Sequence, residues 1–112
     1  NEIYPVAVQY LKQMADTVNS LNSANIEADF IAEDTKELSA LVKRMKQAIQ
    51  KLENALDSYH STRGDVEYKA LIARDRLVNS MNELRSVTDA IETRVDAKLW
   101  PIPSYVELLF DI

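Results

Sequence analysis

The chain has 112 residues, of which 46% are hydrophobic and 28% are charged, and its formal net charge is −5. This balance favours a folded domain, because disordered chains combine low hydrophobicity with high charge. The sequence contains one glycine, one histidine and no cysteine. It therefore excludes glycine-rich phosphate-binding loops, disulfides, thiolate zinc sites and cysteine nucleophiles.

The acidic charge and the distribution of apolar residues bear on partners and compartment. Proteins that bind nucleic acid usually carry a basic surface, so we predict no nucleic-acid partner. No apolar run approaches the roughly 20 residues that span a bilayer, so we predict no membrane partner. The lack of cysteine fits a reducing compartment, and we expect a cytoplasmic protein. The chain opens at Asn1 without an initiator methionine, and we expect it to be a fragment of a longer chain.

Apolar residues at helical spacing predict a first helix over residues 4–23. Leu11, Met14 and Val18 recur at steps of three and four, which places them on one face. Pro5 suits the first turn of a helix, where its missing N–H group has no partner to lose. An irregular connection is expected over residues 24–34.

This connection contains three large apolar residues, Ile26, Phe30 and Ile31. Asparagine has a low helix propensity, and Asn25 follows two other asparagines in this region. We therefore expect the helical pattern to break here and the apolar side chains to pack on the rest of the domain.

A second helix is predicted over residues 35–61. Asp34 and Glu37 have the spacing of a capping box, and Gly64 stands where a left-handed residue is expected to follow a helix end. Apolar residues then alternate steps of four and three, as in a heptad seam. The seam consists of Leu38, Val42, Met45, Ile49, Leu52, Leu56 and Tyr59.

A third helix is predicted over residues 65–98, with Asp65 as its N-cap. Ala70 and Ala73 allow a close approach of another helix near its start. Its seam consists of Leu77, Met81, Leu84, Thr88, Ile91 and Val95. The short turn before it makes the second and third helices an antiparallel hairpin, along which the first helix can close the core. The predicted fold is an all-α antiparallel three-helix bundle over residues 1–98.

The last segment, residues 99–112, is an apolar tail. Pro101 and Pro103 end the third helix and impose an extended stretch, and Trp100 is the single tryptophan of the chain. Burial of a large apolar side chain contributes roughly 1.5–3 kcal/mol, so we expect the tail to dock on the bundle or on a partner. Its candidate structural or interface residues are Trp100, Pro101, Pro103, Tyr105, Leu108 and Phe110.

Other residues offer weak signals of chemistry. His60 near the end of the second helix allows a phosphotransfer module, and the alternative is an exposed residue that favours the helix dipole. The cluster of Lys43, Arg44 and Lys46 is read as a solvated face. The third helix carries several carboxylates, but the chain has no Glu-x-x-His motif for a di-metal bundle, and arginines interleave with the acids. We therefore predict surface ion pairs, and no catalytic or metal-binding residue.

The run from Leu99 to Phe110 resembles the C-terminal end of type III glutamine synthetases, which finish in a Leu-Trp-Pro-x-Pro-x-Tyr-x-Glu-Leu-Leu-Phe-like sequence. Residues 3–11 are similar to the helix that follows the catalytic core of that family, and residues 15–19 and 73–75 also resemble family segments. The resemblance thus spans essentially the whole chain, and its most specific part is the tail.

The resemblance implies a parent enzyme that makes glutamine from glutamate, ammonia and ATP. In that family, glutamate is phosphorylated and ammonia displaces phosphate from the acyl phosphate, with Mg or Mn ions holding the phosphates. The family's catalytic, ATP-binding and metal residues lie upstream in a β-sheet core, so none is carried over to this chain. The implied role is structural, with the catalytic domain of the same chain and neighbouring subunits as partners.

Two alternatives from other classes stay open. A free-standing helical adaptor would use the tail or the hairpin to bind a partner protein, and a phosphotransfer module would use His60. Long amphipathic helices without their native partner also self-associate, so a fragment of this kind is expected to pair with itself.

Overall fold

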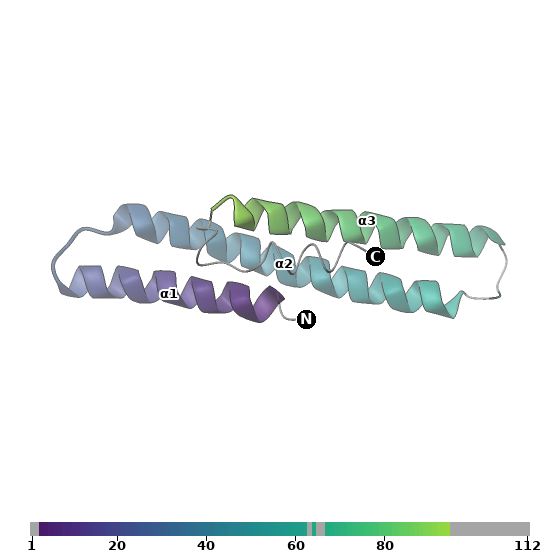
Figure 1. Cartoon of the computed structure of the whole chain (residues 1–112), viewed down its shortest axis with the longest axis horizontal. Coiled ribbons are helices and arrows are strands. Elements are labelled where there is room, and N and C mark those ends of the chain that lie inside the picture. The colour runs from purple at the N-terminus through teal and green to yellow at the C-terminus, as the bar shows by residue number, and fades with distance from the viewer. Residues whose placement is uncertain (1–2, 63, 65–66, 95–112) are drawn as a thin grey trace.

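The computed structural model describes residues 3–62, 64 and 67–94. Nearly all of these residues belong to three α-helices, α1 (Ile3–Ser23), α2 (Asp29–Ser61) and α3 (Glu67–Glu92). Consecutive helices run antiparallel, as Figure 1 shows, and the described ranges contain no strand. The predicted all-α three-helix bundle is confirmed. The predicted cap at Asp65, residues 95–98 and the tail over 99–112 lie outside the described residues.

The end of α1 is fixed by a single asparagine. Asn25 has a φ of 61°, a left-handed conformation that asparagine tolerates better than most residues. The N–H of Ile26 donates to the carbonyl of Leu21 at 2.9 Å, and the N–H of Asn25 donates to that of Asn22 at 3.1 Å. These two bonds form a Schellman motif, in which a left-handed residue satisfies the last carbonyls of a helix.

The second helix begins at Asp29, earlier than predicted, so the capping box expected from Asp34 and Glu37 is wrong. The N-cap residue is Ala28, whose side chain cannot accept a hydrogen bond. The carboxylate of Glu27 instead accepts a hydrogen bond from the N–H of Asp29 at 2.6 Å. An anionic group at this end complements the helix dipole, which explains how the helix starts without a conventional cap.

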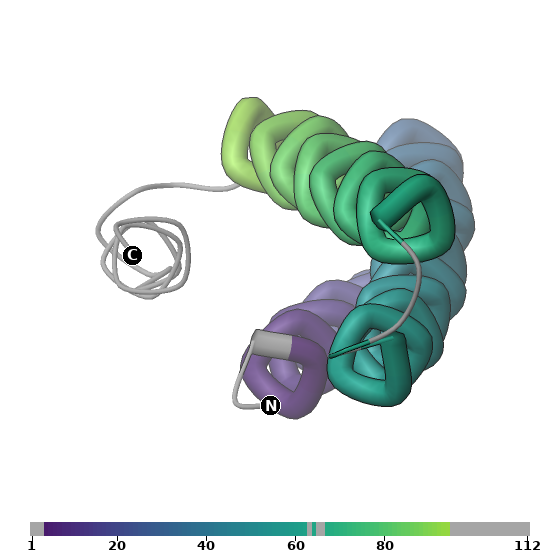
Figure 2. Tube along the Cα trace, turned by 90° about the vertical axis from the view of Figure 1, so that its right-hand side faces the viewer, coloured from purple at the N-terminus to yellow at the C-terminus, as the bar shows by residue number. Residues whose placement is uncertain are grey.

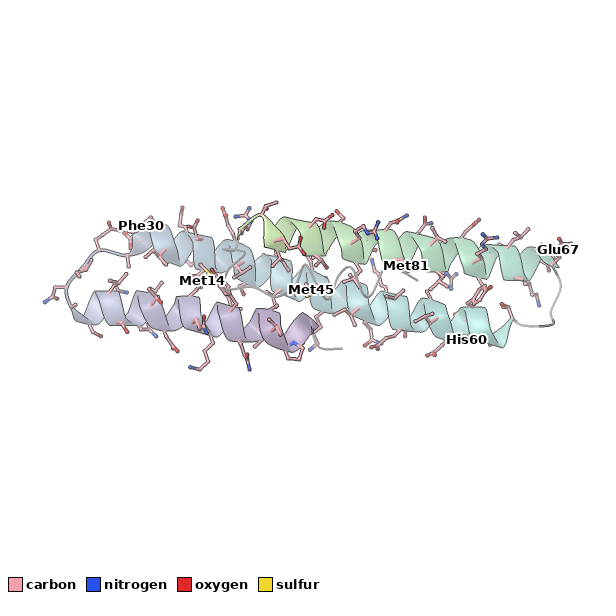
Figure 3. All side chains as sticks on the ribbon, in the orientation of Figure 1. Met14, Phe30, Met45, His60, Glu67 and Met81 are labelled. Atoms are coloured by element: carbon pink, nitrogen blue, oxygen red, sulfur yellow. The ribbon has the colours of Figure 1, made fainter. Side chains whose placement is uncertain are left out.

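The connection between α1 and α2 does not pack on the bundle as expected. Ile26 is 53% exposed and Phe30 is 64% exposed, while Ile31 is half-buried. The reason is the position of α3, whose C-terminal end lies beside Glu37, so the described part of α3 does not extend over the first two turns of α2. Figure 3 shows Phe30 at this end of the molecule.

The described part of α3 is shorter than the helix predicted over 65–98. Beyond its end, the N–H of Arg94 donates to the carbonyl of Ile91 at 3.0 Å in a turn. The guanidinium of Arg94 forms an ion pair with the carboxylate of Glu37 on α2. At the other end of the hairpin, Gly64 has a φ of 82°, so its predicted left-handed conformation is confirmed.

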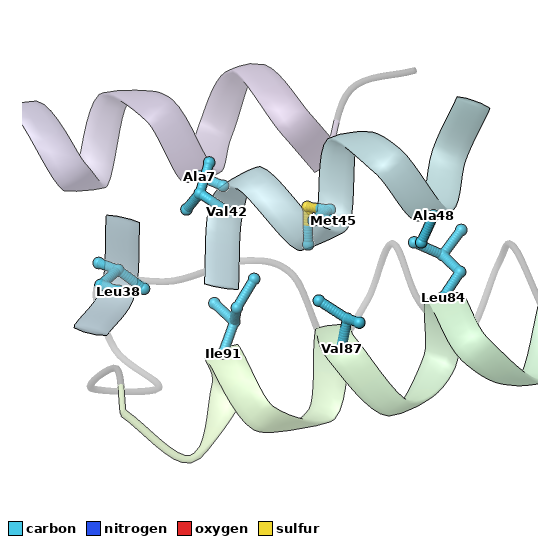
Figure 4. Packing of buried hydrophobic residues seen from close by; sticks show 8 residues of the cluster. All are labelled: Ala7, Leu38, Val42, Met45, Ala48, Leu84, Val87 and Ile91. Carbon is cyan, nitrogen blue, oxygen red and sulfur yellow. The ribbon is translucent and has the colours of Figure 1, made fainter. Parts of the chain in front are cut away.

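The core lies where the three helices overlap along the bundle. In this cluster Leu38 lies opposite Ile91 and Ala48 lies opposite Leu84 (Figure 4). Both predicted seams contribute, but Ala48 and Val87 belong to neither of them. The buried cluster consists of Ala7, Leu38, Val42, Met45, Ala48, Leu84, Val87 and Ile91.

The helices are staggered, and the bundle is correspondingly elongated. The molecule is 65 Å long and 21 Å by 17 Å across, because α2 alone, with 33 residues, extends about 50 Å. Both α1 and α3 pack on α2, but within the described residues no Cα atom of α1 comes within 8 Å of one in α3. Figure 2 shows these two helices on different sides of α2. The first helix contributes Ala7 to the common core cluster and otherwise packs on α2.

Membrane insertion was predicted to be absent. Of the three helices described, none combines the length and the apolar character that crossing a membrane would require.

Candidate functional site

The residues predicted as interface anchors cannot be placed. Trp100, Pro101, Pro103, Tyr105, Leu108 and Phe110 all lie outside the described residues. Their docking on the bundle or on a partner stays a prediction.

The residues considered for chemistry lie apart from one another. His60 is exposed in the last turn of α2, and its ring meets that of Tyr59 edge to face at 6.2 Å between centroids. Figure 3 places His60 at the end of the molecule near the start of α3. Among the residues that the structure describes, no three histidine or carboxylate side chains gather where a metal ion could bind.

The charged side chains form ion pairs between helices. Lys51 on α2 contacts Glu83 on α3 at 3.2 Å, and Arg94 pairs with Glu37 as described above. Surface ion pairs were predicted from the interleaved charges of the third helix, and these two pairs link that region to α2. Both pairs are exposed and lie on one side of the α2–α3 contact.

The basic cluster of α2 is dispersed around its helix. Lys43, Arg44 and Lys46 are all exposed, which agrees with a solvated face. The ammonium of Lys46 lies 5.9 Å from the centre of the Tyr4 ring on α1, within the range of a cation–π interaction. This cation therefore contributes to the α1–α2 contact.

The surface most suited to binding is an apolar stripe on α3 that sequence reasoning missed. It consists of Tyr68, Leu71, Ile72 and Val78, each of which is about half exposed, and we call it the outer α3 stripe. At 100° per residue, Leu71 points about 140° away from Leu84, which lies in the core. Leu71 therefore faces away from α2, whereas Ile72 lies at the edge of the stripe, where it lines a depression together with Ser58 and Thr62 at the end of α2. Tyr68 stands three and four residues before Leu71 and Ile72, which was the available signal, but the buried seam of the same helix is the stronger pattern.

Polar side chains border this stripe. Arg74, Asp75 and Asn79 line a shallow surface depression together with Leu71 and Val78. An apolar centre with a polar rim is the usual anatomy of a protein–protein interface. Exposed apolar patches of this kind mark interaction sites more often than isolated apolar residues do.

A second feature lies between α1 and α3. Met14, Asp34, Leu38 and Arg94 line a cavity of about 150 Å³ near the end of α3. Along α1, Val6, Tyr10 and Met14 stand four residues apart and pack, half-buried, against the core cluster. We call this cavity, together with the apolar side of α1 that carries Val6, Tyr10 and Met14, the α1–α3 groove.

The described part of the chain is an all-α segment of three helices, with an apolar stripe on α3 and a cavity near the end of α3 as its notable surface features. No protein-family model matches the chain, and no solved structure matches it. The chain is nevertheless similar to a part of each of two longer proteins. Type-3 glutamine synthetase of Dictyostelium discoideum is 24% identical over 120 residues, which cover 96% of this chain. Glutamine synthetase of Bacteroides fragilis (strain YCH46) is 25% identical over 115 residues, which cover 98% of this chain.

The resemblance to glutamine synthetase expected from the sequence is therefore confirmed, over nearly the whole chain. The chain spans only 15% and 16% of the lengths of these two relatives.

Proposed function

We propose that this chain is a helical segment of a type III glutamine synthetase, and that it serves packing or assembly of the enzyme rather than its chemistry. The similarity to two glutamine synthetases over 96–98% of the chain supports this proposal. One of the two relatives carries the type-3 designation. The small share of each relative that the chain spans is consistent with a segment of a larger polypeptide.

The outer α3 stripe is the observation that carries the assembly role. A helix in a self-sufficient bundle presents polar residues to solvent, whereas α3 presents Leu71 and Val78 on its outer face. The proposed occupant of this face is the remainder of the glutamine synthetase polypeptide, in the same chain or in a neighbouring subunit. Apolar residues of that part of the enzyme would contact the outer α3 stripe, and polar residues around them would contact Arg74 and Asp75.

The chemistry of the parent enzyme belongs to this proposal as well. It would condense glutamate with ammonia at the expense of ATP, through a phosphorylated glutamate, with a divalent metal ion holding the phosphates. The groups that bind ATP, metal and glutamate would come from other parts of the polypeptide, in the cytoplasm. This segment would act on that chemistry only through the stability and assembly of the enzyme.

Sequencing the coding region upstream of Asn1 is the first test. A reading frame that continues in phase into a glutamine synthetase catalytic region supports the proposal. A start codon within a few residues of Asn1 would contradict it and favour the free-standing adaptor.

The role of the stripe is tested in the enzyme encoded by that frame. Leu71→Asp places a charge in the centre of the stripe, and we expect it to reduce the fraction of assembled enzyme in analytical ultracentrifugation. Ser86→Asp is the matched control, because it adds the same charge to an exposed site of the same helix outside the stripe. Equal assembly of both variants would show that the outer α3 stripe is not an interface.

A further inference from the structure

The α1–α3 groove is incompletely covered by the helices that form it. Its wall on α1 consists of Val6, Tyr10 and Met14, and its floor on α2 includes Leu38 and Met45. The two wall helices pack on α2 but do not approach each other within the described residues. Viewed along the bundle, α1 and α3 lie as two separate arms that each pack on α2 (Figure 2).

Side chains inside the groove are nevertheless fully shielded from solvent. Thr88 on α3 is 0% exposed, as is Met45 on the floor. Thr88 lies about 140° around α3 from Glu83, the residue that pairs with Lys51 of α2, so it is buried on the other side of the α2–α3 contact from that ion pair. The Thr88 hydroxyl donates to the carbonyl of Leu84 at 2.7 Å. Its hydrogen-bonding capacity is therefore satisfied within the helix, and its methyl group is free to make apolar contacts. Such a wall suits an apolar occupant.

The chain leaves α3 at the mouth of this groove. Arg94 lines the cavity at the groove's end together with Met14 and Leu38, and its ion pair with Glu37 holds it there. Residues 95–112 follow directly. From this anchor, the next segment needs only a few residues to turn back along the bundle.

We propose that residues 99–110 of this same chain occupy the α1–α3 groove and complete its core. The segment has the right length, because the groove runs about 20 Å from Leu38 to Leu52, and twelve residues span about 18 Å as a helix and up to ~40 Å when extended. It also has the right chemistry. Its large apolar residues are Leu99, Trp100, Ile102, Val106, Leu108, Leu109 and Phe110.

A segment tethered at the groove has an advantage over any free competitor. A short tether gives an effective concentration in the millimolar range, far above that of a second copy of the chain at working dilution. The occupant is therefore the chain's own tail rather than a partner. This inference rests on the bundle alone and stands whether or not the chain acts within a glutamine synthetase.

The chain provides a convenient reporter for this arrangement. Trp100 is its only tryptophan, and the absence of cysteine allows a single cysteine to be introduced and labelled with bimane, a dye that tryptophan quenches on contact. Gln13→Cys places the dye on the edge of α1 that carries Val6 and Tyr10. Lys12→Cys is the matched control, because this neighbouring exposed position lies on the edge that carries Val8.

In the full 112-residue chain we expect strong quenching of the dye at position 13 and little quenching at position 12. The substitution Trp100→Phe should restore the fluorescence of the dye at position 13. The quenching should be independent of dilution, since the contact is intramolecular. Quenching at neither position, or equally at both, would overturn the proposal. Quenching that disappears on dilution would overturn it in favour of a second copy. Far-UV circular dichroism of each labelled chain confirms that the helices are intact.

Discussion

Replacing Leu84 with alanine removes three carbon atoms from the middle of the bundle. Leu84 is 0% exposed, and the residue opposite it is Ala48, whose methyl group is too small to fill the space (Figure 4). At about 0.8 kcal/mol per buried methylene, the lost transfer free energy is roughly 2.4 kcal/mol. The cavity left behind raises the usual cost of such a change to about 2.7–5.0 kcal/mol. We expect Leu84→Ala to lower the free energy of unfolding by an amount in this range.

Leu71→Ala is the matched comparison, because it makes the same chemical change on the same helix. Leu71 is 52% exposed, so its substitution loses only about half of the transfer free energy and leaves no enclosed cavity. Alanine also has the higher helix propensity, and we expect a loss below about 1 kcal/mol. Urea unfolding followed by far-UV circular dichroism measures both values. Equal unfolding midpoints for the two variants would refute the assignment of the inner and outer faces of α3.

Three further predictions concern local features. Asn25→Ala should destabilise the chain by about 1 kcal/mol in thermal unfolding, because alanine disfavours the left-handed conformation, whereas Asn25→Gly should cause no loss. The hydrogen bond and the charge of Asp16 raise the pKa of Lys12 above its ordinary value of 10.5, so Asp16→Asn should lower that pKa in an NMR titration. The stabilisation linked to this raised pKa is present below the ordinary pKa and is lost as the pH rises through the raised value. A double-mutant cycle on Lys51 and Glu83 should yield less than about 1 kcal/mol, decreasing with added salt, because both side chains are largely exposed; a larger, salt-independent coupling would contradict this.

Periodicity predicted the helices well but their limits less well. The seam through Leu38, Val42 and Met45 is buried as predicted, because apolar residues at steps of three and four must share one face. Ala48 and Ala55 are buried as well, although neither belongs to the seam. Small residues carry little hydrophobic signal, yet they allow the close approach of α3, which only the tertiary arrangement reveals.

The helix start at Asp29 was missed for a related reason. A side chain from outside the helix, that of Glu27, provides the cap, and the conventional capping pattern occurs further along by coincidence. Similarly, the exposure of Phe30 depends on where α3 ends, which is a property of another element. Local sequence patterns contain no information on either point.

The binding surfaces were harder to predict than the fold. The sequence drew attention to the tail because of Trp100 and its flanking prolines, and its similarity to a known family pointed to the same segment. The outer α3 stripe passed unnoticed, because α3 carries apolar residues on two opposite faces and a single-face pattern describes only one of them. Which of two apolar faces becomes the core depends on the hairpin partner.

The staggered packing has a consequence for how the chain folds. Each helix packs only on its neighbour in sequence, since α2 contacts α1 and α3 while those two do not meet within the described ranges. Such local pairings give a low contact order, which is associated with fast folding. During synthesis, α1 and α2 can associate as soon as both have emerged, and α3 then adds to a surface already formed. The order of the sequence is thus also the order in which the described contacts can form.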